Sequence, residues 1–180
     1  MGWDGDDYQR RFDALASAGT DVHGEASFVL AFSPATVLDA GCGTGRVGIE
    51  LARYGIEVVG ADVDPSMLAT AHRRAPGITW IEADLTALDL GRTFDLVVMA
   101  GNVPLFTPPG TEADLVAGVA RHVRPGGLLV AGFSLDRGYS AEAYDAHAEA
   151  AGLTLVERHA TWDRQPFVAG GDYAVSVHQA

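Results

Sequence analysis

Strand-like and helix-like runs alternate along most of this chain, and that alternation restricts the fold more than any other feature. Short apolar runs predict strands, and the amphipathic runs between them predict helices. The strand-like runs are Thr36–Ala40, Glu57–Ala61, Ile78–Ile81, Phe94–Ala100 and Leu128–Phe133. The helix-like runs are Arg46–Arg53, Pro65–Arg74, Glu112–Val123 and Ala141–Ala151. Strands separated by helices form βαβ units, so we predict a doubly wound α/β fold with a mostly parallel sheet.

The last part of the chain breaks this alternation. Two strand-like runs, Leu153–Trp162 and Asp172–Gln179, are joined only by Asp163–Gly171, with no helix between them. A connection that short favours an antiparallel pair. We therefore expect a Rossmann-like, seven-stranded sheet in which a C-terminal hairpin contributes one antiparallel strand.

Two short helices are expected before the first strand. Tyr8, Phe12 and Leu15 recur at helical spacing, and a second helix is expected from about His23 to Phe32. A chain of 180 residues suits one domain. Within that domain we expect residues 1–33 to form an N-terminal helical cap and residues 34–180 to form a cofactor-binding core.

Composition excludes several classes of partner. The formal net charge is −12, and all 12 basic residues are arginines that form no basic stripe, so nucleic acids and anionic membranes are poor partners. Cys42 is the single cysteine, which excludes an intrachain disulfide and a cysteine-based metal cluster, and we expect no metal site. The acidic first residues lack the order of a secretion signal, and no apolar run approaches the roughly 20 residues of a membrane span. We therefore expect a cytoplasmic protein.

A glycine-rich turn directly follows the first predicted strand. Gly41-Cys42-Gly43-Thr44-Gly45 lies between that strand and the helix that begins at Arg46. Such a turn lets a ligand approach bare backbone, and it aims free N–H groups at an anion. Loops that bind phosphate, dinucleotides or S-adenosylmethionine all share this device. A phosphate loop requires a lysine, which this chain lacks.

A dinucleotide loop is the main competitor. Gly43-Thr44-Gly45-Arg46-Val47-Gly48 satisfies the G-x-G-x-x-G pattern. In that fingerprint the first glycine should end the strand. Here Gly41 and Cys42 already lie between the strand and Gly43, so the pattern begins too late. The pattern alone leaves an NAD(P)-dependent oxidoreductase open as an alternative.

Asp39 and the three glycines that follow it belong to a longer series of motifs. The further stretches are Val58–Leu68, Glu82–Leu85, Phe94–Asn102 and Arg124–Val130. In this order and spacing the chain resembles the class I S-adenosylmethionine-dependent methyltransferases, among them small bacterial members whose acceptor is unassigned. The resemblance extends from the first strand through the C-terminal hairpin. It implies S-adenosylmethionine as the cofactor and S-adenosylhomocysteine as the product.

The resemblance also implies a set of cofactor-binding residues. Asp62 would accept from the ribose hydroxyls, and Asp84 and the backbone N–H of Leu85 would contact adenine. Asp39 would either fix the glycine turn from beneath or face the cofactor ammonium. Helix capping is the competing role for Asp64 and Asp84. The expected cofactor-binding residues are Asp39, Gly41, Cys42, Gly43, Gly45, Asp62, Val63, Met67, Asp84, Leu85, Ala100 and Gly101.

Three loops at the carboxyl ends of the strands are expected to line the methyl acceptor, together with the N-terminal helices. These loops are Asn102–Thr107, Ser134–Tyr139 and Asp163–Gly171. The available side chains are Tyr8, His23, Glu25, Asn102, Phe106, Arg137, Tyr139, Trp162, Arg164 and Phe167. Two arginines among aromatic groups favour a small organic acceptor that is anionic or aromatic.

The catalytic residues stay unassigned, with two weak candidates. His23 is the candidate general base, against simple packing at a helix start, and Asn102 is a candidate for orienting the acceptor or the ammonium. We expect methyl transfer to a small-molecule acceptor by a monomer or homodimer. A non-catalytic module that binds S-adenosylmethionine is the other alternative.

Overall fold

A computed structural model of the chain describes residues 4–19 and 22–180. Its strands are β1 (Thr36–Ala40), β2 (Glu57–Asp62), β3 (Thr79–Glu82), β4 (Phe94–Met99), β5 (Val123–Ser134), β6 (Thr154–His159) and β7 (Tyr173–Gln179). Its helices are α1 (Gly5–Ser17), α2 (Gly24–Leu30), α3 (Arg46–Arg53), α4 (Pro65–Arg74), α5 (Val103–Phe106), α6 (Glu112–Ala120) and α7 (Ala141–Ala150), with a 3₁₀ turn η1 (Leu85–Ala87). No helix of the described residues is long and apolar enough to cross a bilayer.

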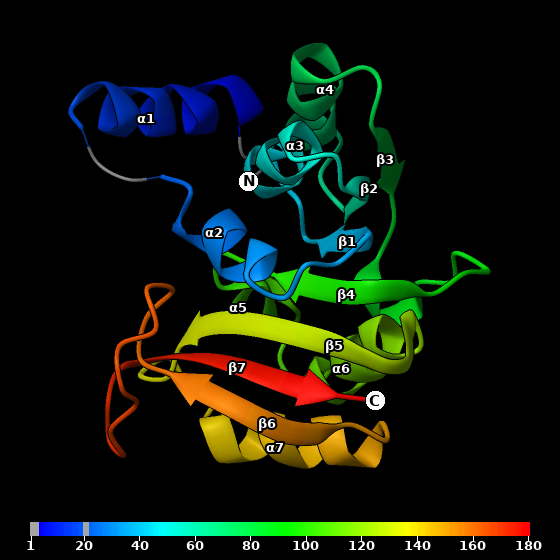
Figure 1. Ribbon diagram of the computed structural model, residues 1–180, viewed down its shortest axis with the longest axis vertical. Coiled ribbons are helices and arrows are strands. Elements are labelled where there is room, and N and C mark those ends of the chain that lie inside the picture. The colour runs from blue at the N-terminus through cyan, green and yellow to red at the C-terminus, as the bar shows by residue number, and fades with distance from the viewer. Residues whose placement is uncertain (1–3, 20–21) are drawn as a thin grey trace.

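The seven strands form one sheet in the order β3-β2-β1-β4-β5-β7-β6 (Figure 1). Strands β1 to β5 pair in parallel, and β7 is antiparallel to both β5 and β6. The predicted fold class, with one reversed strand from a C-terminal hairpin, is therefore confirmed. The chain moves outward from β1 to β3 and then returns to β4 on the other side of β1. This reversal places a topological switch point between β1 and β4, where open α/β sheets bind their ligands.

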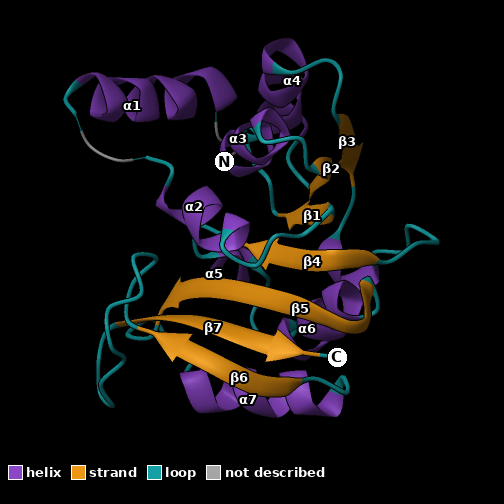
Figure 2. Ribbon diagram, in the orientation of Figure 1, coloured by secondary structure: helices purple, strands orange, loops and turns teal. Residues whose placement is uncertain are grey.

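Helices cover both faces of the sheet, as Figure 2 shows. One apolar cluster packs α2 and α3 against β1, β4, β5 and β7, with Val29 and Leu51 fully buried. A larger cluster packs η1, α6 and α7 against the opposite face, with Leu115 and Tyr144 at its centre. Helix α4 packs on Trp80 of β3. The alternating strand residues thus supply two apolar faces, as a buried parallel sheet requires.

Two predicted bounds were wrong, and two short elements were missed. The helix predicted to reach Val123 ends at Ala120, and β5 begins at Val123 rather than Leu128. The reason is that Val123 already pairs with Phe94, and a register shift in β4 accommodates Arg124–Gly127 as a bulge. The segment after β4 contains the short helix α5, and η1 follows β3. Both elements are too short to produce a periodic signal.

Candidate active site

The glycine turn lies at the switch point, at the carboxyl end of β1. Gly41, Gly43 and Gly45 all have positive φ, of 79°, 53° and 77°. A Cβ added to Gly41 would lie 2.5 Å from a methyl of Val103, and one added to Gly45 would lie 2.5 Å from the Trp80 ring. A Cβ on Gly43 would meet nothing within 4 Å. Two of these glycines are therefore needed for packing, whereas Gly43 presents open backbone to a ligand.

Asp62 fixes this open backbone from the neighbouring strand. Its Oδ2 accepts from the Gly43 N–H at 2.7 Å, and its Oδ1 accepts from the Asp64 N–H at 2.9 Å. Asp64 caps α4 by accepting from the N–H groups of Ser66 and Met67, which is the capping role expected from sequence. Each Asp62 oxygen retains a second lone pair, so the carboxylate still has the capacity to accept from a ribose hydroxyl.

Asp39 lies beneath the turn. It is 2% exposed, and its Oδ2 accepts from the Gly48 N–H of α3 at 2.9 Å. Burial raises the pKa of this carboxyl to about 7. Of the two roles expected for Asp39, this geometry supports fixing the turn from beneath. Cys42 is also buried, and burial raises its thiol pKa, so the thiol stays protonated at neutral pH.

The residues expected beside adenine follow β2 and β3. Val63 is 66% exposed at the end of β2, whereas Met67 is buried in the first turns of α4. Asp84 caps η1 and accepts from the N–H and hydroxyl of Thr86, and these hydrogen bonds lower its pKa. Leu85 is buried beneath α6. Val63 thus offers an apolar surface at this edge, and Asp84 is held in place as a charged acceptor.

The end of β4 forms the other side of the switch point. Gly101 has φ +78°, and a Cβ there would meet nothing within 4 Å. Asn102, with φ +67°, accepts from the Ser134 N–H through Oδ1 at 2.8 Å. Its own N–H donates to the Gly132 carbonyl at 3.3 Å. Asn102 therefore ties the end of β4 to β5 and fixes where Ala100 and Gly101 lie.

Sequence reasoning missed the contacts that join α1 and α2 to the glycine turn. The hydroxyl of Thr44, 1% exposed, donates to Gln9 Oε1 of α1 at 2.7 Å. Arg46 makes a bidentate ion pair with Glu25 of α2, at 2.6 and 2.9 Å. Thr44 and Gln9 are 35 positions apart in the sequence, and Arg46 and Glu25 are 21 positions apart. Local patterns in the sequence therefore carry no signal for these contacts. They fix the two N-terminal helices against the start of α3.

The half-buried Tyr8 of α1 belongs to the same region. Burial raises the pKa of its phenol, and the charges of Arg46, Glu25 and Asp62 act on it. The Arg46 guanidinium also lies 4.6 Å from the centre of the Phe12 ring. Helix α1 therefore places an aromatic face beside the charged groups around the glycine turn.

His23 directly precedes α2, and its Nδ1 lies 3.7 Å from Glu50 Oε2 on α3. Its role as a general base stays a prediction. Tyr139 is buried, stacks on Phe133 and hydrogen-bonds to His147, and its expected place in the acceptor pocket also stays a prediction.

The terminal hairpin places an aromatic pair above β5. The Trp162 Nε1–H donates to the Tyr173 hydroxyl at 3.1 Å. Both side chains lie over Gly132, where an added Cβ would come within 2.3 Å of the Trp162 ring and 2.9 Å of the Tyr173 oxygen. Burial raises the pKa of Tyr173 to about 12, so its hydroxyl keeps a proton to donate. We define the surface formed by Gly132, Trp162 and Tyr173 as the acceptor face.

The arginine expected to attract an anionic acceptor is engaged elsewhere. Arg164 pairs with Glu157 at 2.9 Å and lies 4.2 Å from the centre of the Phe28 ring. Arg46 is paired with Glu25. Arg137 is exposed on the loop after β5, and Phe106 is exposed at the end of α5. Of the two arginines on which the expectation of an anionic acceptor rested, Arg164 is paired and Arg137 is exposed, so that expectation stays a prediction.

The sheet order, the single reversed strand and the glycine turn at the switch point define a Rossmann-like α/β protein with a ligand site at that point. A family model described as "Methyltransferase domain" matches residues 37–127. The chain belongs to the class I S-adenosylmethionine-dependent methyltransferase family, which confirms the resemblance and identifies S-adenosylmethionine as its cofactor. This assignment excludes the alternative of an NAD(P)-dependent oxidoreductase. The third glycine of that pattern, Gly48, lies inside α3, where a Cβ would come within 3.1 Å of Asp39.

Several known proteins are similar to this chain. A trans-aconitate 2-methyltransferase from Methylobacterium nodulans is 33% identical over 71% of this chain and 48% of that enzyme. A cypemycin N-terminal methyltransferase from a Streptomyces species is 34% identical over 64% of this chain and 50% of that enzyme. The chain thus spans about half the length of these relatives. A TehB-like methyltransferase structure from Corynebacterium glutamicum is 37% identical, with a TM-score of 0.91, and covers 97% of this chain and 96% of its own.

Proposed function

We propose that this protein transfers a methyl group from S-adenosylmethionine to a small-molecule acceptor. The observation that carries the proposal is the open backbone at Gly43, held by Asp62 at the switch point of the sheet. When bound, the cofactor supplies an electrophilic methyl group on a sulfonium. The cradle fits it, because the turn presents open backbone at Gly43 at the switch point and Asp62 offers oxygens to its ribose.

The remaining cofactor contacts belong to the same proposal. Val63 and Met67 would pack on adenine. Asp84 and the Leu85 N–H would form hydrogen bonds with the edge of the adenine ring. Ala100 and Gly101 would lie beside the methionine portion of the cofactor. Asp39, Gly41, Cys42 and Gly45 would act by shaping the turn. We further propose a cytoplasmic location, supported by the lone cysteine, and a monomer or homodimer that binds no nucleic acid.

The acceptor would bind between the acceptor face and Asn102. Trp162 offers a flat apolar surface there, and the Tyr173 hydroxyl offers a proton to a lone pair of the acceptor. Their role would be to align the nucleophile with the methyl group, and alignment alone supplies a large part of such a rate. Among the described residues we assign no general base.

The proposal is tested by incubating the protein with S-adenosylmethionine and a metabolite library and measuring formation of S-adenosylhomocysteine. Turnover on at least one small acceptor is expected. Cofactor binding without turnover on any acceptor would favour the non-catalytic module instead. Absence of S-adenosylhomocysteine binding at millimolar ligand by calorimetry would overturn the cofactor site itself.

Asp62→Ala is expected to weaken S-adenosylhomocysteine binding by roughly 1–3 kcal/mol, because it removes a charged acceptor of both the turn and the ribose. Calorimetric titration measures this loss. Asp64→Ala is the matched control two residues away. It removes the cap of α4 and should cost roughly 0.5–2 kcal/mol of folding stability with little change in affinity. Wild-type affinity in Asp62→Ala would show that the ribose lies elsewhere.

A further inference from the structure

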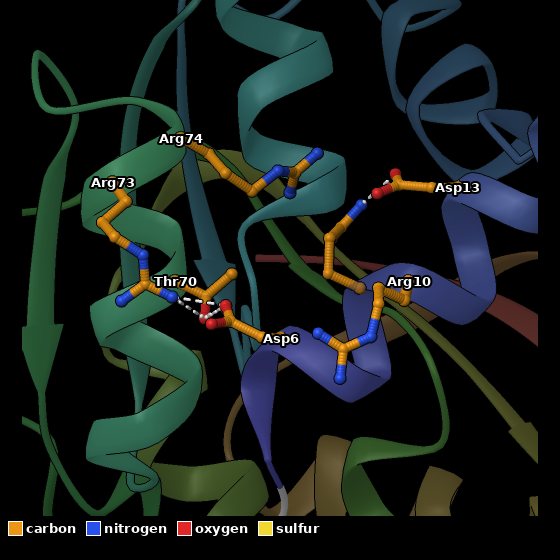
Figure 3. Close-up of a pocket in the computed structure, with 7 residues that line it drawn as sticks. Asp6, Arg10, Asp13, Thr70, Arg73 and Arg74 are labelled. Atoms are coloured by element: carbon orange, nitrogen blue, oxygen red, sulfur yellow. Dashed lines mark hydrogen bonds and ion pairs between the residues drawn. The ribbon is translucent and has the colours of Figure 1, made fainter.

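A charged hollow of about 280 Å³ lies between α1 and α4, outside the proposed cofactor and acceptor sites. Figure 3 shows Arg10 and Asp6 on the α1 side, and Arg73 and Arg74 on the α4 side. Asp13 of α1 completes the charged lining. Three cations thus face two anions, in a chain whose formal net charge is −12. Asp7 of α1, outside this lining, adds a third carboxylate beside Arg10.

Arg74 is the unusual member of this lining. Its NH1 donates to the Thr44 carbonyl of the glycine turn at 2.8 Å, and no ion pair among the described residues includes it. Burial lowers its pKa, the charge of Asp13 acts in the opposite direction, and the charges of Arg53 and Arg46 lower the pKa further. Arg74 also lines a second hollow, of about 180 Å³, between α1 and α3. Arg74 is exposed at the surface, and its guanidinium has further N–H donors that could bind an anion in the hollow.

The two other arginines are paired in ways that a ligand can replace. Arg73 bonds Asp6, and Arg10 bonds Asp7. The Arg73 and Arg10 side chains are 57% and 68% exposed, and exposed ion pairs of this kind contribute little free energy. A planar guanidinium binds phosphate and carboxylate oxygens in bidentate fashion. Both side chains are therefore available to an incoming oxyanion.

We propose that the hollow between α1 and α4 binds a small oxyanion, carrying phosphate or carboxylate groups, through Arg10, Arg73 and Arg74. The ligand would bridge the two helices, because Arg10 belongs to α1 and the other two arginines belong to α4. It would also hold α1 near the glycine turn, since Arg74 bonds Thr44 and Thr44 bonds Gln9 of α1. The lining shares no residue with the proposed cofactor and acceptor sites.

The test is thermal unfolding of the full chain with inorganic phosphate or citrate, each compared with sodium chloride at equal ionic strength. A saturable rise in Tm beyond that of chloride is expected from at least one oxyanion. The anion that gives the larger rise in Tm identifies the ligand as phosphate-like or carboxylate-like. If neither exceeds chloride, the proposal is overturned.

Variants locate the site. Arg74→Gln is expected to weaken the apparent oxyanion affinity roughly tenfold or more, as loss of one charge-assisted contact predicts. Because this change also removes the bond to Thr44, Arg10→Gln provides a second variant that leaves the glycine turn intact. Arg121→Gln, at the exposed end of α6, should retain wild-type affinity. Equal affinities in all three variants and the wild type would reject the site.

Discussion

Gly43→Val is expected to lower the affinity for S-adenosylhomocysteine roughly 100-fold or more, which corresponds to about 2.8 kcal/mol. The valine side chain would project into the space that is open above Gly43, and it would keep the ligand from a close approach to the backbone of the turn. This loss should exceed that of Asp62→Ala, which removes one acceptor but leaves the turn accessible. Calorimetric titration of the folded variant measures the effect.

Gly55→Val is the matched control for this experiment. Gly55 follows α3 with φ +83°, and a Cβ there also meets nothing within 4 Å. Both variants place a β-branched residue in left-handed backbone, which costs roughly 1–3 kcal/mol of stability. Both should therefore unfold at similarly lowered temperatures, and only Gly43→Val should lose the ligand. A Gly43→Val protein that binds like Gly55→Val would mean that the cofactor does not lie over the turn.

This contrast shows how far the sequence determines the site. The strand–turn–helix pattern predicted correctly where the glycine turn would lie, because that pattern is local. The sequence did not distinguish Gly43 from Gly41 and Gly45, whose neighbours Val103 and Trp80 come from distant segments. Only the folded chain shows that two of the glycines serve packing and one remains open.

The fold was predictable for the same reason, and the error at β5 comes from a contact between distant segments. Apolar periodicity identified every strand of the sheet, and the short connection before β7 predicted its reversed direction. The start of β5 was misplaced because Arg124–Gly127 reads as a turn, whereas pairing of Val123 with Phe94 continues the strand through it. The Glu25–Arg46 pair and the Arg74 hollow also depend on contacts between distant segments. Such contacts leave no periodic signal in the sequence.

Asp39→Asn is expected to make the protein more stable than the wild type above pH 7, and the advantage should disappear toward pH 4. Burial raises the pKa of Asp39 from 3.8 to about 7 in the folded state. Between these values the folded protein binds more protons than the unfolded chain, so the contribution of Asp39 to stability falls as pH rises. The difference corresponds to a free energy on the order of 2–4 kcal/mol at pH 8. Asparagine keeps an oxygen that accepts from Gly48 N–H, but it carries no charge.

Denaturant unfolding of both proteins from pH 4 to pH 8 measures this difference, and Asp95→Asn supplies a control of opposite sign. The Arg124 guanidinium and the N–H groups of Thr36 and Ala35 lower the pKa of Asp95 to about 2. Its stabilisation is therefore present above pH 4 and is lost as pH falls toward 2. Asp95→Asn should be less stable than the wild type by a constant amount from pH 4 to 8, while Asp39→Asn diverges from it. If the Asp39→Asn difference also stayed constant over that range, Asp39 would be ionised beneath the turn, and a partner cation would have to be sought there.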